Sequence, residues 1–203
     1  MKLSHILIKV NDLDKEVQIW RDKGFIVEYG TKYKPYNALI YFKDGPFIEL
    51  FKFNGLPNII NKILILLKRN KFVDKMNYWK EHKEGLLTIV LENYNNNLNL
   101  EINILKKYNM SGILSNKVRK DINNNILKFK ILFVNDKYFP DLMTYFNIDP
   151  KPNKDIHPNG IKGIKSISLG LSNEYKEVFL ELCDDPTIKV FEGNGIKDIE
   201  YIK

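Results

Sequence analysis

The chain opens with a segment in which apolar side chains alternate with other side chains, over residues 3 to 10. A repeat of two residues is typical of a half-buried strand, so Ile6, Ile8 and Val10 are expected to share one face. His5 then lies on the opposite face. The pattern therefore predicts a strand that packs on one side and presents a histidine on the other.

A helix is predicted directly after this strand, because Leu13, Val17 and Trp20 fall at the spacing of one helical face. Asp12 precedes them and can cap the free amides of the first turn. Three strands are expected to follow, at residues 25–30, 37–42 and 46–51. The order of this first unit is β-α-β-β-β.

The same order recurs later in the chain, where strands are expected at residues 86–93, 111–118 and 126–134. A shorter third copy ends in a predicted hairpin over residues 187–202 that turns at residues 193–195. We therefore predict an α+β fold made of repeated β-α-β-β-β modules, within a single unit that spans residues 1–203. Its expected parts are module 1 (1–55), a helical insertion (56–83), module 2 (84–147) and an abbreviated module 3 (160–203).

The composition is typical of an ordinary globular protein and gives no sign of an oxidising compartment. Its 203 residues are 44% hydrophobic, and the single cysteine, Cys183, excludes an internal disulfide and is expected to be a small buried hydrophobe. Charged residues such as Lys9 and Asp12 interrupt the N-terminus where a signal peptide would need an apolar stretch. A cytoplasmic location is expected.

The net charge of +7 does not by itself indicate nucleic-acid binding, because the lysines are spread along the chain and no nucleic-acid-binding motif occurs. We expect no nucleic-acid partner. The most apolar run, residues 59–67, contains Asn61 and Lys62 and is far shorter than the roughly 20 residues of a spanning helix, so no membrane partner is expected. Such a stripe is usually core or a homodimer seam, although it could bind a partner chain or lie on an anionic bilayer.

Several stretches together resemble the vicinal oxygen chelate superfamily, and more narrowly its glyoxalase-like domain branch, which has the glyoxalase, bleomycin-resistance and dioxygenase fold. They are His5 with the following strand, Asn-Asp-Leu at 11–13, Lys-Gly-Phe at 23–25, and the strands ALIYF and PFIELF. HPNGIKGI at 157–164 is similar to a signature of that branch. The resemblance implies that curved mixed sheets pair around a cleft, in which a divalent metal often sits.

The resemblance also implies that the metal takes one ligand from the first strand of a module and one from its last strand. The matching positions are His5 and Glu49, and Glu49 is in addition the expected catalytic residue. Alternation supports this pairing, because Ile48 and Leu50 would then face the helix. Imidazole and carboxylate ligands suit Zn, Fe, Mn or Ni. The residues expected to line the cleft are Asn37, Tyr41, Phe47, Phe51, His157 and Asn159.

The second module departs from the pattern, because Leu86 or Leu87 and Met143 or Thr144 stand where its two ligands would be. A third ligand could come from elsewhere in the chain, and the candidates are His82, His157 and Glu200. Each also has a structural interpretation: a solvated side chain for His82, a turn residue for His157 and an exposed strand residue for Glu200.

Two functions are consistent with these features. The first is a metal-dependent lyase, isomerase or dioxygenase that acts on a small oxygenated molecule. The second is a drug-sequestering protein that holds an apolar or aromatic molecule without a metal and without converting it, which the degenerate second module favours. A small molecule is the expected partner in both, and a homodimer is left open. Motifs for nucleophilic hydrolysis, phosphate loops and dinucleotide binding do not occur.

Overall fold

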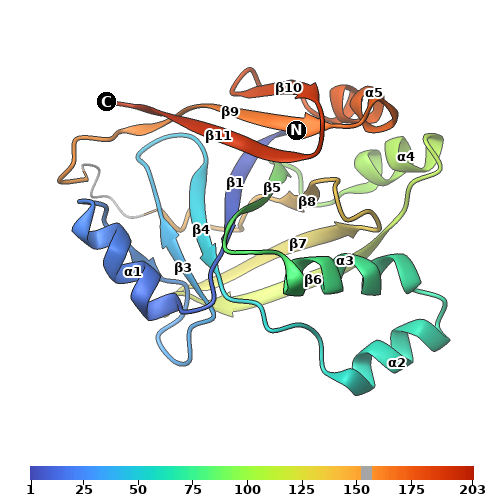
Figure 1. Ribbon diagram of the computed structural model, residues 1–203, viewed down its shortest axis with the longest axis horizontal. Helices are drawn as coiled ribbons and strands as arrows, with labels where there is room; N and C mark the ends of the chain where they lie inside the picture. The colour runs from blue at the N-terminus through green and yellow to red at the C-terminus, as the bar shows by residue number, and fades with distance from the viewer. Residues whose placement is uncertain (152–156) are drawn as a thin grey trace.

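The computed structural model describes residues 1–151 and 157–203, which form one eight-stranded sheet, one three-stranded sheet and helices packed around them (Figure 1). Module 1 consists of β1 (Lys2–Lys9), α1 (Leu13–Asp22), β2 (Glu28–Tyr29), β3 (Asn37–Ile40) and β4 (Phe47–Phe51). The insertion holds α2 (Asn58–Leu66) and α3 (Asn70–Glu81). Module 2 consists of β5 (Gly85–Asn93), α4 (Asn99–Lys107), β6 (Gly112–Lys120), β7 (Ile126–Val134) and β8 (Asp141–Thr144). The C-terminal part contains β9 (Gly163–Leu171), α5 (Asn173–Leu182), β10 (Ile188–Glu192) and β11 (Gly195–Ile202).

The beginning of the chain folds as its pattern predicts. Ile6 and Ile8 of β1 are buried in the same apolar cluster as Val17 of α1, whereas Leu7 belongs to a second cluster on the other face. The side chain of Asp12 accepts a hydrogen bond from the backbone amide of Lys15 at 3.1 Å, which satisfies one free amide of the first helical turn.

The eight-stranded sheet joins both modules within one chain, in the order β2-β3-β4-β1-β5-β8-β7-β6. At its centre, β1 runs parallel to β4 of its own module and antiparallel to β5 of the other. The sheet curls so that its two ends approach, and the guanidinium of Arg119 on β6 donates to the carbonyl of Gly30 beside β2 at 2.6 Å. The predicted α+β fold with a curved mixed sheet around a cleft is confirmed.

Each face of this sheet is covered by different elements. The outer face packs against α1, α4, α5 and the three-stranded sheet, and Cys183 is buried there as predicted. The inner face packs against α3 of the insertion, whose Phe72, Met76 and Trp79 belong to the second cluster. The insertion therefore closes one side of the hollow that the curled sheet forms.

The prediction of a C-terminal hairpin over residues 187–202 is wrong. Strands β10 and β11 both form but lie on opposite sides of β9, β10 parallel to it and β11 antiparallel. The helix α5 provides the crossover that a parallel pair needs. The chain then crosses the end of β9, where the amide of Gly193 donates to the carbonyl of Leu171 at 3.2 Å. Gly170 leaves room for this crossing, since a Cβ there would lie 2.7 Å from the backbone nitrogen of Asn194.

Candidate active site

A pocket of about 410 Å³ lies on the inner face of the sheet, between the two modules and α3. Its walls are largely apolar and rich in aromatic rings: Phe51 and Phe53 come from β4 and the following loop, Trp79 from α3, and Phe129 and Phe133 from β7. The ring of Phe51 stacks on Phe53, with centroids 5.6 Å apart, and both rings meet Trp79 edge-on. A volume of this order suits a small organic molecule.

His5 and Glu49 meet inside this pocket, where they come from the neighbouring strands β1 and β4. The Nε2 atom of His5 lies 3.3 Å from Oε2 of Glu49, and the imidazole stacks on Phe47 with centroids 4.6 Å apart. The Nδ1 atom lies 3.1 Å from Oγ of Ser4, whose hydroxyl donates to Sδ of Met143. The imidazole thus lies between the hydroxyl of Ser4 and the carboxyl group of Glu49.

Burial changes the proton affinity of both groups. It lowers the pKa of His5 to about 3, and the positive charge of Arg119 adds to this effect, so the imidazole is neutral at neutral pH. Burial raises the pKa of Glu49, although the hydrogen bond from Asn37 and the charge of Arg119 act against it. The pair thus combines a neutral imidazole with a carboxyl group that takes up a proton more readily than a solvated glutamate.

Asn37 orients Glu49 from the adjacent strand β3. Its side-chain amide donates to Oε1 of Glu49 at 2.8 Å, so Oε1 is held on Asn37 while Oε2 faces His5. The carboxyl group is therefore fixed in one orientation, which is a requirement for a group that transfers protons.

Module 2 adds positive charge to the same pocket. Lys117 and Arg119 of β6 line it, as does Lys52 after β4. Among the described residues, none of these three side chains forms an ion pair with a carboxylate. Because Asp141 at the pocket wall is paired with Lys75, these three cations outnumber the carboxyl group of Glu49, and the pocket carries a net positive charge suited to an anionic group.

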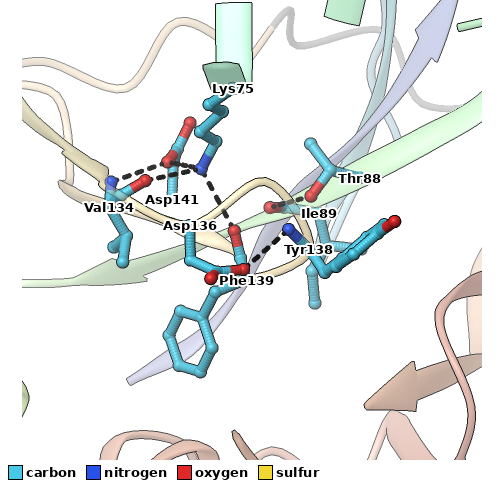
Figure 2. A network of polar contacts seen from close by, with 8 residues as sticks. All are labelled: Lys75, Thr88, Ile89, Val134, Asp136, Tyr138, Phe139 and Asp141. Atoms are coloured by element: carbon cyan, nitrogen blue, oxygen red, sulfur yellow. Dashed lines mark hydrogen bonds and ion pairs between the residues drawn. The ribbon is translucent and has the colours of Figure 1, made fainter. Parts of the chain in front are cut away.

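A buried ion pair fixes α3 against the sheet beside the pocket, as Figure 2 shows. The ammonium of Lys75 donates to Oδ1 of Asp141 at 2.5 Å and to the carbonyls of Val134 and Phe139 at 3.1 Å each. These three acceptors match the three donors of an ammonium group, and both side chains are fully buried. Since Trp79 lies one turn after Lys75, the pair also holds the indole that α3 presents to the pocket.

Three of the residues expected to line the cleft lie elsewhere. His157 is buried on the outer face, where Nδ1 accepts from the amide of Ile26 at 2.9 Å and the ring packs between Phe25 and Phe42. Asn159 donates to the carbonyl of Lys23 at 2.9 Å and so caps the end of α1. Tyr41 lies behind Phe47, with centroids 5.0 Å apart. Asn37, Phe47 and Phe51 line the pocket.

None of the candidates for a third metal ligand lines the pocket. His82 ends α3 and contacts the carbonyl of Lys83 and the ring of Tyr78. Glu200 lies on β11, where it accepts from Ser166 and pairs with lysines. His157 is held on the outer face as described above.

The donor atoms of the pocket do not fit the divalent metal that the fold implies. The residue paired with His5 on β5 is Val90, and Met143 of β8 lines the pocket nearby. Asp141, which pairs with Val90, is already bound by Lys75. Across the residues that the structure describes, no group of three suitable donors occurs. His5 and Glu49 alone, beside the guanidinium of Arg119, make a poor cation site.

Lys117, Arg119 and Asp141 were missed by the sequence analysis. The strand that carries Lys117 and Arg119 was predicted to end at residue 118, which cut off the arginine. Two cations at positions i and i+2 of a strand share one face, and this spacing is the signal that could have placed both in the cleft.

Comparison with known proteins assigns this chain to a family. The model of the family described as glyoxalase-like domain matches residues 3–181. The chain belongs to this family. The resemblance to the vicinal oxygen chelate superfamily is thereby confirmed. No curated protein matches this glyoxalase-like chain.

The solved structures that match share little sequence with this glyoxalase-like protein. A methylmalonyl-CoA epimerase with methylmalonyl-CoA and ammonium is 14% identical, with a TM-score of 0.44 over 74% of this chain and 98% of its own. A Streptomyces coelicolor methylmalonyl-CoA epimerase variant with 2-nitronate-propionyl-CoA is 14% identical, with a TM-score of 0.42 over 71% and 96%. A hypothetical protein from Bacillus halodurans is 14% identical, with a TM-score of 0.38 over 75% and 98%.

Proposed function

We propose that this glyoxalase-like protein binds a small, largely apolar molecule that carries a carboxylate or similar anionic oxygen group. The observation that supports it is the placement of Arg119, with Lys117 nearby, in a largely apolar pocket that also contains a neutral imidazole. The aromatic walls would bury the apolar part of the ligand. The guanidinium would face its anionic group, because planar donor pairs match carboxylate geometry.

The experiment compares matched ligands that differ only in charge. Aromatic and acyl carboxylates, each beside its primary amide, are titrated into the protein while the fluorescence of Trp79 and the melting temperature are followed. Carboxylates are expected to quench the fluorescence and raise the melting temperature more than the amides do. In Arg119→Gln this preference should disappear, whereas in Trp79→Phe the quenching should disappear and the thermal shift remain. Equal binding of acids and amides by the unaltered protein would refute the proposal.

The second candidate is a metal-independent isomerase that moves a proton on the bound molecule. It is favoured by the pairing of Glu49 with His5, because a fixed carboxyl group of raised proton affinity is suited to take a proton from carbon and return it. In this reaction Glu49 would act as the base, and Arg119 would face the oxygen on which negative charge develops.

Solvent isotope exchange separates catalysis from simple binding. The protein is incubated in deuterium oxide with a carboxylate that it binds, and the recovered molecule is examined by mass spectrometry. Deuterium next to the carbonyl group, absent in Glu49→Gln although that variant still binds, would support proton transfer. A ligand recovered without deuterium would leave binding as the function and would contradict the isomerase.

A further inference from the structure

The helix α2 exposes almost all of its apolar side chains. None of its residues is buried, and Leu66 at its end is 82% exposed. Ile59, Ile63 and Leu67 are exposed as well, and only Leu64 packs partly against the cluster beneath α3. In Figure 1 the helix projects from the body of the protein next to α3. The alternative in which this stripe is core is therefore wrong.

The charge around α2 has one sign. Residues 50–73 contain no aspartate or glutamate, although they contain lysine or arginine at five positions. Lys68, Arg69 and Lys71 follow the helix directly and are exposed. In the part of the chain that the structure describes, none of them forms an ion pair. An apolar surface thus adjoins a group of uncompensated cations.

These two features together decide what covers the helix. A second copy of the chain that paired through the same surface would bury the apolar side chains, but its residues 50–73 would offer no carboxylate to Lys68, Arg69 and Lys71. An anionic lipid surface meets both requirements, because its acyl region takes apolar side chains and its phosphates attract cations. We propose that α2 docks the protein on the surface of an anionic bilayer.

This docking is peripheral, since no helix among the described residues is long and apolar enough to cross a membrane. Ile59, Ile63 and Leu66 would enter the boundary between headgroups and acyl chains, and Lys68 with Arg69 would lie at the phosphates. The proposal concerns the surface of a membrane, which the sequence left open for this stripe of apolar residues. The proposal does not depend on the function of the pocket, because no residue of α2 lines it.

Flotation of the whole protein with vesicles tests this docking. Vesicles of phosphatidylcholine alone are compared with vesicles of phosphatidylcholine and phosphatidylglycerol, at low salt and at high salt. The protein should float with the anionic vesicles only, and high salt should release it. Replacing Lys68 and Lys71 with glutamine should weaken binding about fivefold for each cation removed.

Matched variants distinguish binding through the surface of α2 from nonspecific association with the vesicles. Leu66→Glu should abolish flotation, whereas Leu100→Glu, at an apolar residue of α4 that is 65% exposed, should leave it unchanged. Lys176→Gln with Lys197→Gln is the control for charge. The proposal is overturned if the protein fails to float with anionic vesicles, or if Leu66→Glu floats as before. It is also overturned if the protein is a dimer that Leu66→Glu dissociates, because a second copy then covers the helix.

Discussion

Gly30 leaves the space that the side-chain oxygen of Asn37 occupies. A Cβ at residue 30 would lie 2.1 Å from Oδ1 of Asn37, closer than atoms can approach without a shift. The same asparagine donates to Oε1 of Glu49, so the absence of a side chain on Gly30 fixes the orientation of the carboxyl group through Asn37. This relationship makes Gly30 a positioning residue of the site.

Gly30→Ala should therefore raise the pKa of Glu49. The added methyl group forces the end of Asn37 to turn away, and the hydrogen bond that lowers the pKa of Glu49 is lost. The pH profile of any activity that needs ionised Glu49 should move to higher pH, with stability reduced by only about 1 kcal/mol. Gly163→Ala is the control, because the nearest atom to a Cβ there is 3.6 Å away. An unchanged profile would show that Asn37 does not control Glu49.

Acid should destabilise the protein through His5. Burial lowers the folded-state pKa of His5 to about 3, whereas the unfolded chain binds the same proton near its ordinary value of 6.5. The contribution of the buried, neutral His5 to the free energy of unfolding is fully present above pH 6.5 and is lost as the pH falls toward 3. The free energy of unfolding should decrease by at most about 1.4 kcal/mol per pH unit from this residue.

Urea denaturation of the protein and of His5→Gln between pH 7 and 5 measures that slope. The variant should lose less stability on acidification than the unaltered protein. His82→Gln is the matched control, because His82 lies at the end of α3 outside the pocket. Parallel slopes for the protein and His5→Gln would show that the imidazole is solvated, contrary to the structure.

The sequence was sufficient for the elements whose pattern is local. Alternation placed His5 opposite Ile6 and Ile8, and β7 forms over the predicted residues 126–134. The pairing of strands was harder to predict, because it depends on contacts between distant segments. The Gly-Asn-Gly turn at residues 193–195 is typical of a hairpin, yet it carries the chain across the end of β9.

The candidate site was predictable where family resemblance and alternation agreed, as for His5 and Glu49. It was not predictable where a residue's role depends on a partner far along the chain. Lys75 falls on the buried face of α3, which is a local signal for a buried charge, but nothing in the sequence identifies Asp141 as its partner. The motif around His157 left a turn and the cleft open as its place, and packing against Phe25 and Phe42 holds the side chain on the outer face.

Removing one member of the buried ion pair should destabilise the protein more than removing both. Lys75→Met leaves the carboxylate of Asp141 without its counter-charge and should cost about 3–5 kcal/mol of unfolding free energy. Adding Asp141→Leu removes the stranded charge and should restore part of this loss.

Chemical denaturation of the single and double variants gives the coupling energy between Lys75 and Asp141. The exposed pair of Lys107 and Glu181 is the control, and its coupling should be below about 1 kcal/mol. If the losses from Lys75→Met and Asp141→Leu simply add, the ammonium and the carboxylate do not stabilise each other.

Divalent metals should not stabilise the protein, because among the described residues His5 and Glu49 are the metal-binding side chains of the pocket that are not already held by Lys75. A metal ion bound by these two side chains would have to fill most of its coordination shell with water, in a pocket rich in aromatic rings and next to the guanidinium of Arg119. Added Zn²⁺, Ni²⁺, Mn²⁺ or Fe²⁺ should therefore leave the melting temperature of the protein unchanged, and His5→Ala should respond in the same way. Elemental analysis of the untreated protein is the second measurement. If it finds near-stoichiometric metal that is lost in His5→Ala, the prediction is contradicted, and residues beyond this pair must complete a metal site.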